Sequence, residues 1–117
     1  MRQFLSIAKA LADANRVRIL KLLEKQELCV CQVIAVIGTA PSTVSKHLSI
    51  LRNAGLVEDR KDGRWVYCRM PNRRELPAAQ AILKWTRESL NDDRVIVEDR
   101  RKLARVLKTD PRELCRP

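Results

Sequence analysis

The chain has 117 residues and a formal net charge of +10, with hydrophobic residues making up 45% of the sequence. This length is enough for one domain and too short for two, and the composition allows a buried core. The basic charge favours a polyanionic partner, because a positive surface releases the counterions that such a partner holds. Only four aromatic residues are present, which argues against single-strand nucleic-acid binding by base stacking.

Targeting segments and cysteines give a first indication of the cellular compartment in which the protein resides. No stretch approaches the roughly 20 apolar residues of a membrane helix, and the N-terminal segment has no apolar core typical of a signal peptide. We therefore expect a cytoplasmic protein without membrane attachment. In that reducing compartment we expect the cysteines to serve in metal binding, thiol chemistry or packing, and not in disulfides. They are Cys29, Cys31, Cys68 and Cys115.

Three helices are predicted at the N-terminal end of the chain. Residues 3–12 carry an apolar stripe at helical spacing, and a second helix follows that Asp13 or Asn15 can cap. Residues 32–37 form a short apolar helix that Gly38 ends, as glycine commonly does at a helix C-terminus. These helices lead directly into the segment that carries the functional signal.

The next helix, Pro41–Asn53, has the pattern of a DNA-recognition helix. Val44, Leu48 and Leu51 fall on one face, and the opposite face is short, polar and basic. Such a face fits the major groove, where hydroxyls and amines meet base edges and phosphates. An ordinary solvated helix is the alternative. The residues expected to contact DNA are Ser42, Thr43, Ser45, Lys46, His47, Ser49 and Arg52.

A basic β-hairpin is predicted after this helix. Strand candidates at 56–60 and Trp65–Arg69 are separated by four residues that contain Asp-Gly, a strong hairpin turn signal. Lys61 and Arg64 flank the tip, where they can reach a phosphate or the minor groove; an exposed turn without DNA contact is the alternative. Helix, turn, helix and hairpin together predict a mostly α (α+β) winged helix-turn-helix domain with a two-stranded wing.

Two further helices are predicted at 75–90 and 94–108, so that a single domain spans 1–108 and a flexible tail spans 109–117. The first helix and the helix at 75–90 are amphipathic surfaces without an assigned partner. We expect them to pack across a homodimer, since a twofold dimer reads a palindromic site; packing within the protomer is the alternative. The interface candidates are Phe4, Leu11, Leu76, Ile82, Leu83 and Trp85.

A Cys-x-Cys pair, Cys29 and Cys31, lies just upstream of the recognition helix. Thiolates select soft ions, so the pair can chelate one. Inside a regular helix, positions i and i+2 lie ~200° apart and cannot grip the same ion. Either Cys29 lies ahead of the helix, or binding unwinds the first turn. A further possibility is that both cysteines only pack.

Several motifs, in order, resemble the ArsR family of winged-helix metalloregulatory repressors: residues 11–20, 45–48, 51–57 and 59–67. Residues 27–31 are similar to the arsenic-binding box of arsenical-resistance repressors. The resemblance implies a homodimer that represses an arsenic-resistance operon on double-stranded operator DNA. It also implies release of DNA when As(III) or Sb(III) binds, with no organic cofactor. The third cysteine that the box often carries is replaced here by Ile34.

The coordination number of the site is open at this stage. Two thiolates with an exogenous thiol or water would suffice, or Cys115 could supply a third bond, since it lies in the flexible tail and can reach across a dimer. Cys68, on a predicted strand, is better explained as a small packing residue. Zinc is a weaker candidate, because it prefers four Cys or His ligands and the helix at 75–90 has no histidine.

Two other functions remain open: a winged-helix sensor of another soft metal or of thiol oxidation, and a basic winged-helix module that binds acidic proteins. An enzyme is not expected. The chain has a single histidine, no glycine-rich phosphate loop and no nucleophile paired with a base.

Overall fold

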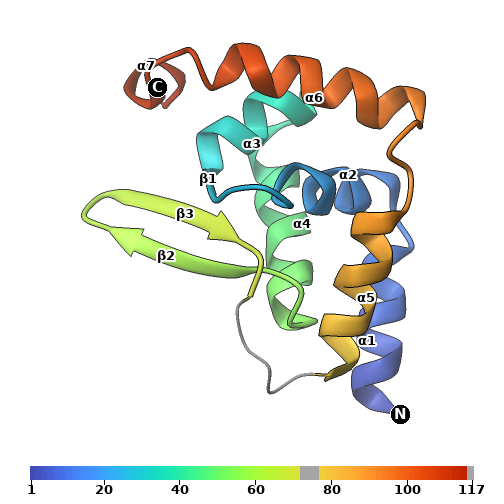
Figure 1. Cartoon of the computed structure of the whole chain (residues 1–117). Coiled ribbons are helices and arrows are strands. Elements are labelled where there is room, and N and C mark those ends of the chain that lie inside the picture. Colours follow the sequence, from blue (N-terminus) through green and yellow to red (C-terminus); the bar gives the residue numbers. More distant parts are fainter. Residues whose placement is uncertain (72–76, 116–117) are drawn as a thin grey trace.

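The computed structural model describes residues 1–71 and 77–115, which form mainly helices with one small sheet (Figure 1). The elements in chain order are α1 (Arg2–Leu11), α2 (Ala14–Leu22), β1 (Leu28–Cys29), α3 (Val30–Ile37), α4 (Pro41–Asn53), β2 (Glu58–Asp62), β3 (Trp65–Arg69), α5 (Pro77–Glu88), α6 (Arg94–Val106) and α7 (Pro111–Leu114). No helix within these described residues is both long enough and apolar enough to cross a membrane.

The core lies between α2, α3 and α4. It is built from aliphatic side chains with no exposed surface, among them Ile19, Leu20, Val33, Val44 and Leu51. Burying such side chains contributes roughly 1.5–3 kcal/mol each relative to exposure. The predicted inward face of α4 is therefore confirmed, and the opposite face is left free.

Local signals define the ends of these helices. The Asp13 carboxylate accepts hydrogen bonds from the backbone N–H groups of Asn15 and Arg16, so Asp13, and not Asn15, caps α2. Gly38 ends α3 with φ = 82°, a conformation that costs other residues free energy because of their Cβ. This turn directs the chain into α4, which spans the predicted residues Pro41–Asn53.

The sheet has three antiparallel strands in the order β1-β3-β2, and not only the two predicted strands. Leu28 pairs with Cys68, and Cys29 pairs with Tyr67. The sequence gives no signal for β1, since two residues cannot show an alternating pattern. Strand β2 begins at Glu58 and not at residue 56, because the Leu56 N–H still donates to the Leu51 carbonyl of α4 at 3.0 Å.

The wing turn is shorter than the predicted connection of four residues, 61–64, because Lys61 and Asp62 belong to β2. Asp62 pairs with Trp65, so the two loop residues are Gly63 and Arg64. Gly63 has φ = 60°, which suits a tight hairpin turn between twisted strands. Lys61 and Arg64 are both exposed near the tip, as the hairpin pattern indicates.

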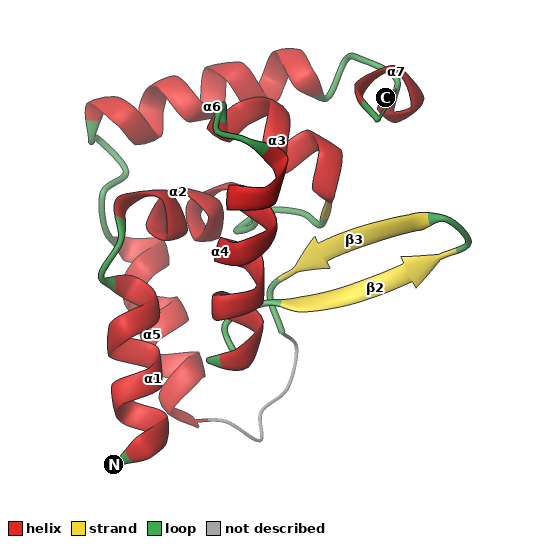
Figure 2. Ribbon diagram, turned by 180° about the vertical axis from the view of Figure 1, so that it is seen from behind, coloured by secondary structure: helices red, strands yellow, loops and turns green. Residues whose placement is uncertain are grey.

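Helices α1 and α5 lie side by side on one flank of the molecule, away from the wing (Figure 2). Their outer surface carries the two most exposed aromatic side chains of the described residues, Phe4 at 69% and Trp85 at 62%. A shallow apolar groove of about 470 Å³ runs between the two helices. This flank is an unpartnered apolar surface.

Helix α6 crosses the opposite end of the molecule and packs on α2 and α3 (Figure 1). An ion pair fixes it there: Arg18 Nε and Nη2 donate to the two carboxylate oxygens of Asp99 at 2.8 and 2.9 Å. Asp99 is 3% exposed, and the bond to its carboxylate raises the pKa of Arg18. The α2–α6 contact therefore includes a charge-assisted pair whose carboxylate is buried.

The segment that we expected to be a flexible tail is partly structured. Residues Pro111–Leu114 form one helical turn, α7, and Asp110 caps it by accepting from the Arg112 N–H. Helix α7 lies next to α3. It places Cys115 against the beginning of that helix.

Candidate functional site

The outer face of α4 is available for DNA. The side chains predicted to contact it are exposed at Ser42, Thr43, Ser45, Lys46 and Arg52, and half-buried at His47 and Ser49. Helix α3, the Gly38 turn and α4 form the helix-turn-helix that supports this face, and the wing projects beside it (Figure 1). A recognition helix with an adjoining hairpin is the geometry that winged-helix proteins use on duplex DNA.

Two of the predicted DNA contacts are held by partners within the chain. Arg16 Nη1 lies 3.3 Å from His47 Nδ1, and His47 Nε2 lies 4.0 Å from the Asp13 carboxylate. Arg52 forms an ion pair with Asp59 at the base of the wing. These side chains connect α4 to α2 and to β2, so any contact that they make with DNA comes in addition to a structural role.

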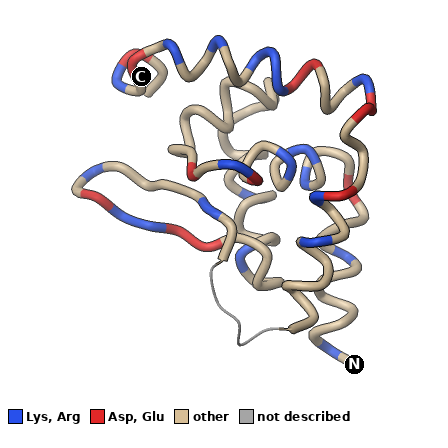
Figure 3. The backbone as a smooth tube through the Cα atoms, viewed as in Figure 1, with Lys and Arg blue, Asp and Glu red and all other residues tan. Residues whose placement is uncertain are grey.

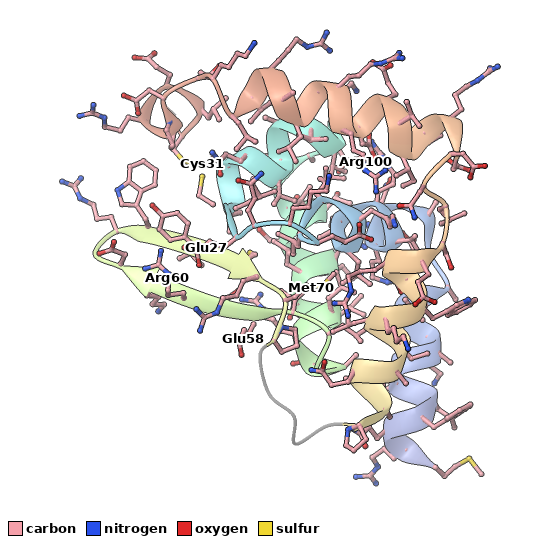
Figure 4. All side chains as sticks on the ribbon, viewed as in Figure 1. Glu27, Cys31, Glu58, Arg60, Met70 and Arg100 are labelled. Atoms are coloured by element: carbon pink, nitrogen blue, oxygen red, sulfur yellow. A yellow bond between two sulfur atoms is a disulfide. The ribbon has the colours of Figure 1, made fainter. Side chains whose placement is uncertain are left out.

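The charge on the wing is mixed. Figure 3 shows acidic and basic residues together along β2. Arg60 stacks over the Tyr67 ring at 4.5 Å and donates to Glu27, the residue two positions before Cys29. This bond to Arg60 holds the pKa of the Glu27 carboxyl below its ordinary value. Figure 4 shows Glu27 and Arg60 facing each other between the cysteine segment and the wing.

All four cysteines line one cleft of about 280 Å³. The cleft lies where the recognition helix, the wing, the beginning of α3 and the end of α7 meet. Its lining residues are Cys29, Val30, Cys31, Ser45, Leu48, Arg52, Arg64, Trp65, Val66, Cys68 and Cys115. An ion held in this cleft would therefore touch elements that also face DNA.

Cys29 lies ahead of α3 and not inside it. It is the N-cap residue, with extended backbone angles of φ = −73° and ψ = 154°, and its side chain is 1% exposed. Its backbone N–H donates to Gln32 Oε1 at 2.9 Å. The structure thus adopts the first of the two arrangements considered above, in which Cys29 and Cys31 are not both within the helix. Gln32 was missed in the sequence, although Gln three residues after an N-cap is a known signal.

The expectation that the cysteines form no disulfide is wrong for one pair. Cys31 and Cys115 are bonded, with Cα atoms 5.5 Å apart and a sequence separation of 84 residues. Figure 4 shows Cys31 at the beginning of α3, facing α7. The pairing follows from the docking of α6, which carries the end of the chain back to α3. No short-range pattern in the sequence indicates that return.

Cys68 differs from the other three cysteines. It is fully buried on β3, and its thiol donates to Asp59 Oδ1 at 3.7 Å. Burial, with the Asp59 charge nearby, raises the pKa of the Cys68 thiol to about 12. The protonated thiol is a poor ligand and nucleophile, which fits the packing role predicted for it.

Within residues 1–71 and 77–115, no three His, Cys, Asp or Glu side chains are arranged to hold a metal ion. The disulfide bears directly on this result, because two of the three predicted sulfur ligands are bonded to each other. Cys29 is a free thiol. Reduction of the pair would give three free thiols among the residues that line the cleft, in addition to buried Cys68.

The predicted dimer residues differ in their exposure. Phe4 and Trp85 are exposed, and Leu11 and Ile82 are half-buried in the groove between α1 and α5. Leu83 differs from the expectation: it is 1% exposed and packs within its own core, so it has almost no surface left for a partner. The predicted contact at Leu76 lies outside the described residues.

The fold and the exposed polar recognition helix define a winged helix-turn-helix DNA-binding protein. Residues 13–59 match the family described as "Bacterial regulatory protein, arsR family". Together with a relative that is 35% identical and covered over 67% of its length, this match shows that the chain belongs to the ArsR family, whose members are DNA-binding transcriptional regulators and not enzymes. The family-level expectation from the sequence is confirmed.

Relatives named for metal resistance match this chain. It is 42% identical over 67 residues to the arsenical resistance operon repressor of Escherichia coli, covering 56% of this chain and 57% of the relative. It is 35% identical over 85 residues to the arsenic resistance transcriptional regulator ArsR2 of Pseudomonas putida, covering 72% and 67%. Cadmium resistance regulators also match. The match to the Escherichia coli relative thus spans less than two thirds of that protein's length.

Solved structures share the fold. The homodimeric winged helix-turn-helix domain of Mb0332 from Mycobacterium bovis, described as a possible ArsR-family regulator, is 29% identical with a TM-score of 0.62. The match covers 80% of this chain and 86% of that one. The family match at 13–59 ends before β3, α5, α6 and α7.

Proposed function

We propose that this protein is a cytoplasmic, homodimeric repressor of an arsenic-resistance operon, and that As(III) or Sb(III) bound by Cys29 and Cys31 releases it from its operator. The observation that carries the proposal is the shared cleft: the Cys-x-Cys pair lines the same cavity as Ser45 and Arg52 of the recognition helix and Arg64 of the wing. The names of the arsenic-resistance relatives support the choice of ion.

The chemistry of the pair favours a trivalent, thiophilic ion. Thiolates are soft ligands, and arsenic and antimony in this oxidation state bind them in preference to oxygen. From the N-cap position, the Cys29 side chain is not constrained to the opposite side of the helix from Cys31. Two sulfur ligands can therefore approach one ion with little unwinding of α3.

Coupling to DNA follows from the short distance along the chain. Bringing the Cys29 thiol onto an ion competes with its buried N-cap position and with the hydrogen bond from its N–H to Gln32. Helix α3 spans only Val30–Ile37, and Gly38 then joins it to α4. A shift at the beginning of α3 is passed through this short element to the DNA-reading helix, so ion binding and operator binding oppose each other.

The homodimer is proposed to form through the outer flank of α1 and α5. An apolar groove with Phe4 and Trp85 beside it is unusual on a monomer surface, and a second copy would cover it. The homodimeric state given for Mb0332 supports this assembly. Twofold symmetry then presents two recognition helices to the two halves of a palindromic operator.

The test uses an operator selected from a random duplex library with the reduced protein. The complex is titrated with arsenite, antimonite, cadmium and zinc while fluorescence anisotropy reports DNA release. Arsenite or antimonite should release the wild type at the lowest concentration. Cys29→Ser and Cys31→Ser should bind the operator normally and show no release by arsenite, whereas Cys68→Ser should behave like the wild type.

Normal arsenite release from either Ser variant would reject the thiol pair as the sensor. Release by cadmium at lower concentration than arsenite would instead support a sensor of another soft ion. A salt series separates DNA binding from the other alternative, a protein-interaction module: affinity for the operator should fall steeply as salt rises and should exceed affinity for a scrambled duplex.

A further inference from the structure

The C-terminal arm of the molecule, residues 94–115, has no role in the function proposed so far. It lies outside the region that matches the family, residues 13–59. Nevertheless it is firmly docked. Asp99 of α6 pairs with Arg18 through two short hydrogen bonds, and the α6 side chains Ile96 and Leu103 are also buried. The arm therefore holds the end of the chain at a fixed place.

That place is the cysteine box. The arm brings Cys115 next to Cys31, with Cα atoms 5.5 Å apart and the two sulfurs in bonding contact. Once reduced, thiols at this separation can both bind a single atom placed between them. The box itself lacks a third sulfur within the helix, because Ile34 packs against the core and has no donor atom.

The remaining cysteine does not compete for this role. Cys68 is fully buried on β3, and its thiol is directed to Asp59. Cys29, Cys31 and Cys115 are thus the thiols left at the cleft, and they come from the beginning of α3 and the end of α7. Trivalent arsenic has three valences, so three sulfurs complete its coordination without water.

We propose that the C-terminal arm supplies Cys115 as the third thiolate of the ion site, from the same protomer that provides Cys29 and Cys31. This inference rests on the proposed function. Arsenous acid would react with three thiols: three As–O bonds break, three As–S bonds form, and the three thiol protons leave with the hydroxyls as three waters. Arsenic remains trivalent throughout.

The disulfide then makes the site conditional on reduction. The sulfur atoms of Cys31 and Cys115 cannot bind an ion as thiolates while they are bonded to each other. A small cellular thiol reduces them by exchange: two of its molecules are oxidised to one disulfide, and the protein recovers two thiols. The oxidised protein is accordingly insensitive to arsenite.

The experiment compares arsenite with phenylarsine oxide, whose arsenic has only two open valences. Reduced Cys115→Ser should lose about tenfold or more in affinity for arsenite and less than about twofold for phenylarsine oxide, since Cys29 and Cys31 remain. X-ray absorption should show three sulfur neighbours around arsenic in the wild type and two in the variant. Cys68→Ser is the matched control, expected to be unchanged in all three measurements, and operator affinity verifies folding.

Two results separate the possible failures. If Cys115→Ser binds arsenite as tightly as the wild type, with the same number of sulfur neighbours, the third-ligand role is wrong and the proposed function stands. If the reduced wild type binds neither arsenical, both proposals fall. Diamide-oxidised wild type should bind no arsenite until dithiothreitol is added, and binding of arsenite by the oxidised protein with its Cys31–Cys115 bond intact would also overturn the inference.

Discussion

The substitution Asp99→Asn tests the ion pair that docks α6. The Asp99 carboxylate is almost fully buried and accepts two charge-assisted bonds from Arg18, at 2.8 and 2.9 Å. Removing one partner of such a pair costs about 3–5 kcal/mol, because the other charge stays in a poorly solvated site. Arg18 keeps its bond to Asn15 at 2.8 Å and is partly solvated, so we expect the lower end, about 3 kcal/mol.

For a chain of this size, about 3 kcal/mol corresponds to a fall of about 10 °C in Tm. Urea denaturation of the reduced protein measures the effect without the contribution of the disulfide. The control is Glu98→Gln on the same helix, whose exposed pair with Arg101 spans 3.6 Å and should contribute less than about 1 kcal/mol. Equal stabilities for Asp99→Asn and Glu98→Gln would refute the reasoning, since burial is the main feature that distinguishes the two carboxylates.

Three further predictions concern the thiol, the dimer and the DNA surface. Because the pKa of the Cys68 thiol is raised to about 12 in the fold, its unfolded form ionises first; the stability it contributes below pH ~9 should decline as pH rises towards 12, and urea denaturation of reduced Cys68→Ala should lack that decline. Trp85→Glu should shift sedimentation equilibrium towards monomer, whereas Val95→Glu should not, since Val95 is an exposed apolar residue on α6, at 50%, outside the proposed interface; a dimeric Trp85 variant would contradict that interface. Lys46→Ala should reduce the salt dependence of operator affinity by about one counterion, while exposed Arg101→Ala leaves it unchanged; the reverse ranking would place the DNA surface elsewhere.

The sequence predicts the elements whose pattern is long and regular. Helix α4 has the predicted bounds, because proline at its beginning and the apolar face at Val44, Leu48 and Leu51 are both local signals. Strand β1 was not predicted, since Leu28 and Cys29 are too few to show a period. Local pattern is therefore sufficient for the helix-turn-helix and insufficient for the strand that completes the sheet.

Long-range docking accounts for the differences in the candidate site. The Cys31–Cys115 bond depends on how α6 lies across α2 and α3, and an amphipathic pattern does not specify which neighbour a helix packs against. The same limit applies to Leu83, whose apolar position on α5 fits an interface or a core equally well in the sequence. Three-dimensional packing decides both cases.

Cys29 is at once the cap of α3 and a member of the sheet, opposite Tyr67 of β3. A strand of two residues gives the hairpin few hydrogen bonds, and an isolated two-stranded ribbon is only marginally stable in water. Glu27, just before β1, accepts a hydrogen bond from Arg60 of β2 and so gives the hairpin a second attachment to this segment. Moving Cys29 away from these neighbours would thus loosen the β2–β3 hairpin as well as shift the recognition helix α4. In the proposed mechanism, a bound ion would therefore weaken DNA contacts at two separate places in each half-operator, one made by the wing and one by α4.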